Sequence, residues 1–451
     1  MANIASILGW IKQNPSRIVD YLPIRQVCME LGLDWRERCL DPATTAALFI
    51  KQIIHGNSAC TQVRHLSDRT FSAQAYCKAR MRLSLVVLQT LSRRLCDTVR
   101  RRRRARRPDL FLGHRVFLVD GSTFSMPDTA PLQAEFGQPG MQKAACGFPA
   151  AHLLAMFDLN SGMLIEAVAS PLRTHDLAKM SRMHPHLRPG DLLLGDTAFG
   201  SYTHFALLLQ AKVHGLMPNH QQRIVDFTPH RRYVGPGEKV RKGLPRSRWI
   251  KSLGLDDQLV EWFKPSRRPR YMSLEPYHAL PASITVREIR RWVRHPGLGY
   301  WVELTIVTTL LDEKTYPAQK LVELRLRRWQ AEVNLRHLKT TMGLEVLKCQ
   351  TVDGVRKELA AFVLVYNLMR LLMLEAAQRQ KTRPDRISFA GVLAWVRVAR
   401  PNQAMPRFVI NPMRPQRIDP RAIKRRPKPF DLMNQPRYKM RETLRKQAYA
   451  A

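Results

Sequence analysis

The sequence predicts a mixed α/β fold. Short apolar runs with strand character fill residues 111–222, whereas apolar residues at helical spacing fill much of 1–110 and 300–380. Residues 223–299 combine many Arg, Pro and Trp residues with short β-like runs, and residues 381–451 are rich in proline and basic residues. We therefore expect a helical N-terminal domain, an α/β core in two segments, a β-rich basic insertion between them, and a basic C-terminal tail.

Two helices are expected in the N-terminal domain, at Thr44–Ile54 and Cys77–Val99, because apolar residues recur there at helical spacing. An arginine run that contains Arg101, Arg102 and Arg103 follows the second helix. Blocks of like charge are often solvated faces, but the same basic bias elsewhere in the chain favours contacts with phosphates. Both interpretations of this run stay open.

Apolar runs bounded by turn residues predict the strands of the core, at Arg115–Val119, His152–Asp158, Met163–Ala169, Asp191–Phe199, Lys212–Pro218 and Tyr300–Thr309. Helical spacing predicts the helices Thr174–Met183, Pro317–Met342 and Val355–Ala377. Helices that follow and close a group of strands are typical of a layered α/β arrangement.

The net charge favours some classes of function over others. The 451 residues include 74 Lys and Arg against 36 Asp and Glu, a formal net charge of +38. The formal net charge is +12 for residues 1–110, +10 for 223–299 and +14 for 381–451. The two segments of the predicted core, 111–222 and 300–380, together carry +2. Such a chain favours a polyanionic partner and disfavours an ordinary enzyme of small metabolites.

The seven cysteines are scattered, without a C-x-x-C pair, and we expect free, buried thiols in a reducing compartment and no structural zinc. The longest apolar candidate, Leu359–Met373, contains Tyr366, Asn367 and Arg370, so no membrane span is expected. The N-terminus lacks the features of a secretory signal. These observations predict a cytoplasmic protein.

Three acidic residues stand in settings that suit metal-assisted phosphoryl transfer. Asp120 and Asp196 lie at the expected ends of apolar strands, with Gly121 free to turn the chain after the first. Glu332 lies on a helix among Arg325, Arg328, Arg336 and Lys339, at spacings that put all five on one face. The structural alternatives are a turn or a cap for each aspartate and an i,i+4 salt-bridge ladder for the glutamate.

The spacing Arg328, three residues, Glu332, six residues, Lys339 resembles part of the signature of bacterial insertion-sequence transposases of the DDE type, in the IS-four family. Val119-Asp120-Gly121-Ser122 and Gly195-Asp196-Thr197-Ala198-Phe199 are similar to the blocks with that family's first two catalytic aspartates. Arg325 stands where the signature has a Tyr, and Thr197-Ala198 stand where Arg-Gly is usual.

The resemblance implies a ribonuclease H-like core interrupted by the β-rich insertion. It implies that Asp120, Asp196 and Glu332 are catalytic and hold two Mg²⁺ ions, which Mn²⁺ can replace. It also implies that Arg328 and Lys339 contact phosphates of double-stranded DNA, with two copies of the chain in the synaptic complex. Arg325 and Arg336 share this helix face and join the expected DNA contacts.

The sequence contains two further candidate sites. Similar transposases stack an insertion-domain Trp on a flipped base, and among Trp249, Trp262 and Trp292 we favour Trp262, with core packing as the alternative. His175 and Asp176 could form an acid–base pair, but Thr174-His175-Asp176 is more typical of a helix start.

The sequence thus predicts a DNA transposase that binds the terminal inverted repeats of its element and catalyses metal-dependent cleavage and strand transfer, with hairpin ends as one route. Two alternatives stay open: a non-catalytic DNA-binding protein or inactive transposase copy, and a metal nuclease without strand joining.

Overall fold

The computed structural model describes most of the chain, in residues 18–20, 22–105, 110–140, 142–174, 176–239, 241–294, 301–400, 402–412, 433 and 435–450. His175 lies outside the described residues, so the expected His175–Asp176 pair is not addressed by it. Arg102 and Arg103 belong to a described helix, but their side chains are outside the described part.

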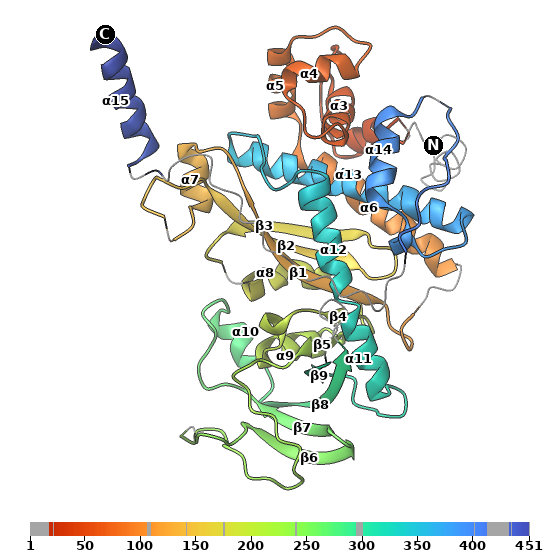
Figure 1. Cartoon of the computed structure of the whole chain (residues 1–451), viewed down its shortest axis with the longest axis vertical. Coiled ribbons are helices and arrows are strands. Elements are labelled where there is room, and N and C mark those ends of the chain that lie inside the picture. The colour runs from red at the N-terminus through yellow and green to blue at the C-terminus, as the bar shows by residue number, and fades with distance from the viewer. Residues whose placement is uncertain are drawn as a thin grey trace.

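One sheet of nine strands runs through the molecule (Figure 1). In sheet order the strands are β3, β2, β1, β4, β5, β9, β8, β7 and β6. β1 is antiparallel to β2 and parallel to β4, and β4 is parallel to β5. The strands are β1 (Val116–Ser125), β2 (Ala150–Asp158), β3 (Leu164–Pro171), β4 (Leu192–Leu194), β5 (His214–Pro218), β6 (Ser247–Gly254), β7 (Asp257–Phe263), β8 (Ser283–Arg294) and β9 (Trp301–Thr308).

The central strands are apolar on both faces, as expected for parallel strands covered by helices on both sides. Val116–Val119 and Leu192–Leu194 are fully buried. The second run ends earlier than predicted, because Gly195 lies against the Phe199 ring and the chain turns into the 3₁₀ helix η4 (Thr197–Phe199). The expected strand Asp191–Phe199 is therefore wrong in its second half.

Gly121 does not turn the chain. β1 continues through it to Ser125, and Gly121 does not adopt a positive φ. A Cβ at this position would lie 2.8 Å from Cε1 of His152, so the glycine makes room for that imidazole. The prediction that Gly121 ends the strand is wrong, because a side-chain contact across the sheet selects the glycine.

Helices cover both faces of the sheet. Consecutive strand residues face opposite sides. Asp120 contacts Arg328 at the start of α12 (Trp329–Arg336), whereas Gly121 lies beside Asp176 of α8 (Asp176–Met183). α12 and α8 therefore lie on opposite faces.

The helix α13 (Val352–Arg379) shares the face of α12. Leu118, two residues before Asp120, lies opposite Phe157, whose ring packs edge-on against Tyr366 of α13. The other helices between β1 and β9 are α7 (Ala130–Phe136), η3 (His184–His186), α9 (Tyr202–Gln210) and α10 (Leu274–His278).

The N-terminal helices pack on α13. They are α2 (Ile24–Glu30), α3 (Pro42–Ile54), α4 (Cys60–Val63), η2 (Arg64–Leu66), α5 (Ala73–Arg82) and α6 (Leu85–Ala105). α6 and α3 both lie against α13, and Asn367 of α13 donates to Ser92 of α6 over 3.1 Å. The predicted single helix Cys77–Val99 is wrong, because the chain leaves the helical conformation at Leu83.

The β-rich segment continues the core sheet. β9 pairs with β5 on one side and with β8 on the other, so β8, β7 and β6 extend the same sheet (Figure 1). After β9, the expected helix Pro317–Met342 divides into α11 (Ala318–Leu326), α12 and the π-helix η5 (His337–Thr341). The predicted continuous helix is therefore wrong, and the first break falls at Arg327 and Arg328.

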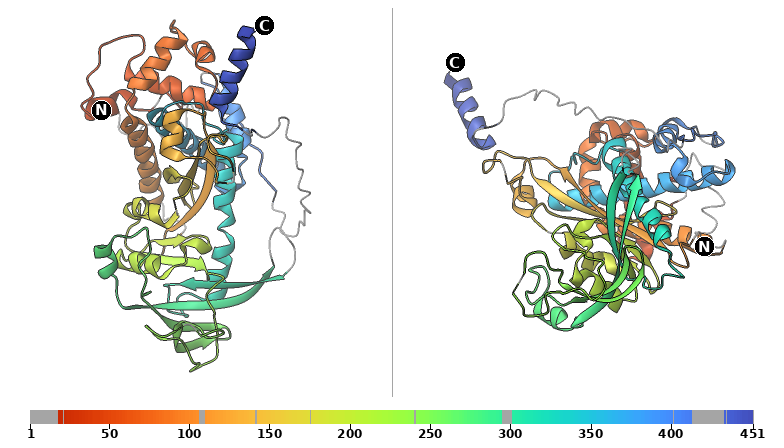
Figure 2. Two further views of the ribbon diagram at one scale, coloured as in Figure 1. Left: turned by 90° about the vertical axis from the view of Figure 1, so that its left-hand side faces the viewer. Right: turned by 60° about the horizontal axis from the view of Figure 1, so that its bottom comes forward.

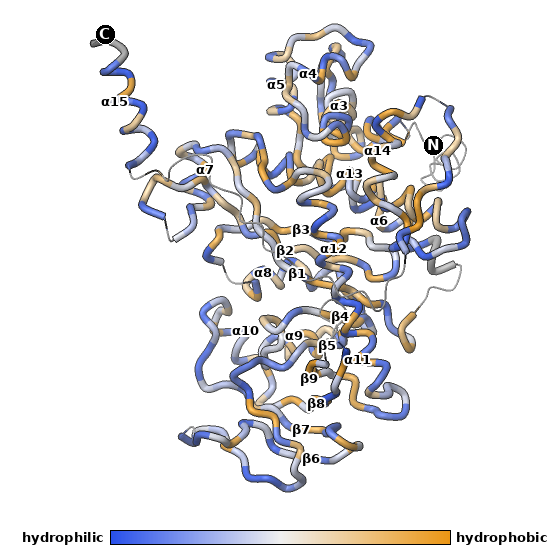
Figure 3. The backbone as a smooth tube through the Cα atoms, viewed as in Figure 1, coloured by the Kyte–Doolittle hydropathy of each residue, from blue (hydrophilic) through white to orange (hydrophobic). Residues whose placement is uncertain are grey.

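The described C-terminal elements are η6 (Pro384–Arg386), α14 (Phe389–Val398) and α15 (Arg437–Ala450). α15 stands apart from the body in Figure 1 and in the right view of Figure 2, and hydrophilic residues predominate along it (Figure 3). Arg437, at its start, pairs with Asp128 over 2.5 Å and lies over the Phe148 ring.

α13 is the one described helix long and apolar enough to cross a membrane, and 89% of its most apolar window is buried inside the protein. Its apolar character is thus accounted for by core packing. All seven cysteines are free, as predicted, but Cys39 and Cys77 are exposed, so the expectation that all are buried is wrong.

Candidate active site

Three carboxylates approach one another from separate elements. Asp120 lies within β1, Asp196 directly follows β4, and Glu332 lies in the first turn of α12. β1 and β4 are parallel neighbours, so side chains toward their carboxyl ends gather at one edge of the sheet. α12 contacts β1 and brings the glutamate to the same place.

Arg328 joins two of these carboxylates. Its Nη1 donates to Oδ2 of Asp120 over 3.0 Å, and its Nη2 donates to Oε1 of Glu332 over 2.5 Å. The two acids are more than 200 residues apart in the chain, yet one guanidinium group contacts both. The arginine side chain is 15% exposed, so this bridge is largely shielded from water.

Burial raises the pKa of Asp120, which is only 8% exposed. Arg328 and the Gly121 N–H act in the opposite direction, and the negative charges of Asp196 and Glu332 raise the pKa further. The charges of Asp196 and Glu332 therefore act on the same aspartate that Arg328 contacts.

Asp196 also has a local structural role. It is the N-cap of η4, and its Oδ1 accepts a hydrogen bond from the Ala198 N–H over 2.9 Å. The helix-cap interpretation of this residue is therefore met, while its second carboxylate oxygen stays available for other contacts. His204 contacts the last residue of η4, because its Nδ1 lies 2.8 Å from the Phe199 carbonyl oxygen.

His204 is a residue that the sequence did not single out. It is fully buried, burial lowers its pKa to about 3, and its ring stacks on that of His184. A histidine within a helical pattern gives no signal of this role, because the partner is a backbone carbonyl.

The other expected DNA contacts lie on four different helices. Burial, with Arg328 next, lowers the pKa of Arg325 to about 10, and the three carboxylates oppose this shift. Arg336 is exposed at the end of α12, and Lys339 is half-buried in η5. Arg101 is exposed in α6.

The expectation that Trp262 stacks on a base is contradicted. The residue is 1% exposed, its Nε1 donates to Glu288, and Arg223 lies over its ring at 3.5 Å. Core packing therefore accounts for it.

Of the three tryptophans weighed, Trp292 is exposed, at 63%, and it has an exposed neighbour in Trp301, at 64%. Trp292 lies opposite Glu303 and Trp301 opposite Arg294, which sets both indoles on one face of the β8–β9 ribbon. Trp301 is not among the tryptophans expected to bind DNA, although the alternating pattern of its strand was a signal for its exposed position.

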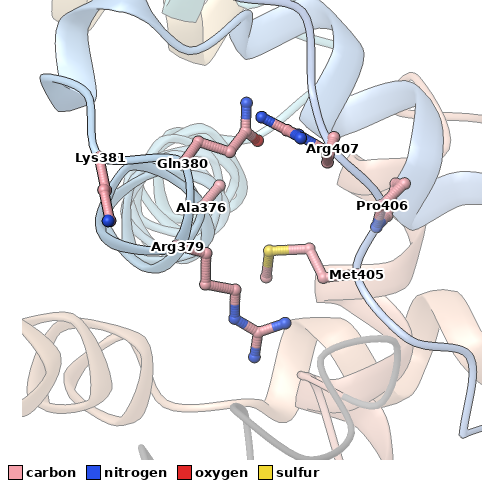
Figure 4. A pocket seen from close by; sticks show the side chains of 7 residues that line it. All are labelled: Ala376, Arg379, Gln380, Lys381, Met405, Pro406 and Arg407. Atoms are coloured by element: carbon pink, nitrogen blue, oxygen red, sulfur yellow. The ribbon is translucent and has the colours of Figure 1, made fainter.

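No group of three or more His, Cys, Asp or Glu side chains is preassembled for a metal ion in the part of the chain that the structure describes. Asp120 and Glu332 instead contact Arg328. A separate pocket of about 360 Å³ lies between the end of α13 and the segment 405–407 (Figure 4), and none of the three carboxylates lines it.

Comparison with known proteins agrees with this geometry. The family described as transposase DDE domain matches residues 112–368, more than half of the chain. The transposase InsG for insertion sequence element IS4 of Escherichia coli strain K12 is 24% identical over 352 residues, covering 70% of this chain and 69% of that protein.

Two solved structures are also similar. The piggyBac transposase synaptic complex with hairpin DNA matches with a TM-score of 0.41 and 10% identity over 88% of this chain and 80% of its own. The Mos1 transposase paired-end complex matches with a TM-score of 0.15 and 13% identity over 40% and 60%. From the family match and the sequence relative, we conclude that the chain belongs to the transposase DDE domain family and is a DNA transposase of the IS4 type.

Proposed function

We propose that this transposase binds the terminal inverted repeats of its insertion sequence and catalyses metal-dependent strand cleavage and transfer into target DNA. Asp120, Asp196 and Glu332 are the proposed catalytic residues and metal ligands. The observation that carries the proposal is the single guanidinium group of Arg328 bound to both Asp120 and Glu332, with Asp196 acting on the same aspartate.

The donor set suits a divalent metal ion. Hard carboxylate oxygens are the ligands that Mg²⁺ and Mn²⁺ prefer, and DDE domains of transposases generally use such ions. The guanidinium group of Arg328 already places one positive charge between two of the three carboxylates. Bound there, Mg²⁺ would supply charge neutralisation at the scissile phosphate and activation of the attacking oxygen.

The protein's own residues position the DNA. Arg328, Lys339, Arg325 and Arg336 lie at or near the carboxylates and are the proposed contacts to the phosphates at the element end. Guanidinium groups suit this task because they donate two parallel hydrogen bonds to a phosphate. Their charge and the fixed backbone of β1 and η4 would hold the scissile bond against the carboxylates without a covalent protein intermediate.

The sheet supports a ribonuclease H-like core. In the order β3-β2-β1-β4-β5, β2 runs opposite to the other four strands, and the proposed active site lies on the face covered by α12. We propose residues 1–110, 223–299 and 381–451 as DNA-holding regions and a homodimer as the synaptic form, because two element ends must be brought together. Cleavage through hairpin ends is part of the proposal, and Trp292 is the exposed candidate for stacking.

A plasmid that carries both ends of the element tests the proposal. With Mg²⁺, the wild-type chain should cut and rejoin it, and Asp120→Asn should bind the ends yet leave them uncut. Glu323→Gln, on the exposed side of α11, is the matched control and should retain cutting. Binding without cutting by the wild-type chain would favour a non-catalytic DNA-binding protein, and cutting without joining would favour a nuclease.

A further inference from the structure

Arg328 lies between two of the proposed metal ligands, Asp120 and Glu332. Its two terminal nitrogens are both engaged, one by Asp120 at 3.0 Å and the other by Glu332 at 2.5 Å. Its Nε is buried and has no hydrogen-bond partner among the residues that the structure describes. Among the described residues, the two carboxylates are therefore the hydrogen-bond acceptors that hold the guanidinium group in place.

The charge around Arg328 would change if a metal ion entered. Three carboxylates face two guanidinium groups, those of Arg328 and Arg325, and these two cations already disfavour each other. A divalent ion among the same carboxylates would add further positive charge beside the largely buried Arg328 and Asp120. Metal and Arg328 therefore compete for the same oxygens.

We propose that Arg328 is a built-in counter-cation, which holds the carboxylates together in the DNA-free protein and leaves them when a divalent ion binds. This inference rests on the proposed function of the same site. The anion that draws the guanidinium away is a DNA backbone phosphate, which offers the bidentate acceptor that the carboxylates give up.

The bridge has an open side through which this exchange can occur. The Glu332 side chain is 41% exposed, whereas that of Asp120 is 12% exposed. Arg328 precedes α12 at the break after α11, and its own N–H bonds the Arg325 carbonyl, so the backbone stays fixed while the side chain turns outward. Contact with Glu332 would thus be exchanged first for contact with an incoming phosphate.

A permanent structural ion pair is the opposing interpretation. In that case Arg328 would be needed to assemble the ligands, and its loss would scatter the carboxylates and weaken metal binding. The two interpretations predict opposite signs for the same measurement.

Calorimetric titration of Mn²⁺ into the full, DNA-free chain makes this distinction. Arg328→Gln should bind Mn²⁺ about tenfold or more tightly than the wild type, because one positive charge beside a divalent ion is removed. Lys320→Gln, which removes a cation from the exposed side of α11, should bind as the wild type does. Adding a duplex of the element end should narrow the difference, because DNA then holds the arginine in the wild type.

Unchanged or weaker Mn²⁺ binding by Arg328→Gln overturns the inference. Circular dichroism and the rise of the melting temperature with added Mn²⁺ verify that this variant is folded and report the same affinity independently. Asp120→Asn should lose the Mn²⁺ site in either background. If it does not, the proposed metal ligands themselves are wrong, so failure of the proposed function is told apart from failure of the arginine exchange.

Discussion

Two tryptophans of the β-rich segment, Trp262 and Trp292, differ in burial: the first is 1% exposed and the second 63%. Trp262→Ala should lower the free energy of unfolding by about 3–5 kcal/mol, because it opens a cavity and leaves Glu288 without its indole donor. Trp292→Ala should leave stability nearly unchanged and weaken binding of distorted element ends by about 1–3 kcal/mol. Urea unfolding and competition binding measure the two effects, and a Trp292→Ala chain with unaltered DNA affinity would remove this residue from the DNA surface.

Single residues also show the reach of sequence reasoning. Residue type, spacing and the family resemblance predict Asp120, Asp196 and Glu332 as a group. The bridge from Asp120 to Glu332 through Arg328, however, depends on a contact across 208 residues, which no local pattern contains. Trp262 had the expected basic neighbours and still proved to be core. Arg223, 39 positions away in the sequence, lies on the indole itself, where a base would have to stack.

At the scale of elements, the apolar strands were predicted well because burial on both faces leaves continuous apolar runs. The errors fall where tertiary contacts override local preference. Packing of Gly195 on Phe199 ends β4 early, and the predicted helix over 317–342 breaks at Arg328, where the side chain turns toward Asp120. Helical spacing continues through that break, so periodicity could not locate it.

Acid should destabilise the packing of η4 and its neighbours. Burial lowers the pKa of His204 to about 3 and that of His184 to about 4, below their ordinary values near 6.5. Between these lowered pKa values and the ordinary value of 6.5, the unfolded chain therefore binds more protons than the folded chain. The free energy of unfolding consequently falls as the pH drops from about 6.5 toward 4. Urea midpoints at pH 7 and pH 5 measure the effect. His204→Gln should flatten the pH dependence, and an equally steep dependence in this variant would contradict the assignment.

Over the whole molecule, the near-neutral core lies among strongly basic segments. α15 stands apart from the body and carries Lys439, Arg441, Arg445 and Lys446. Replacing these four with Gln should leave the unfolding transition in place and lower DNA affinity at low salt. The slope of log affinity against log salt should become shallower by about 0.9 for each lost phosphate contact. An unchanged slope would show that α15 does not hold DNA.

The proposed chemistry depends on metal coordination by three carboxylates, which a change of metal preference reveals. Asp120→Cys, Asp196→Cys and Glu332→Cys replace a hard oxygen ligand with a softer sulfur ligand. Each variant should fail to cleave element ends with Mg²⁺ and regain cleavage with Mn²⁺, whereas Ser122→Cys, on the same strand as Asp120, should cleave with either ion. Cleavage by the three variants with Mg²⁺ at the wild-type rate would contradict the assignment of these carboxylates as the metal ligands.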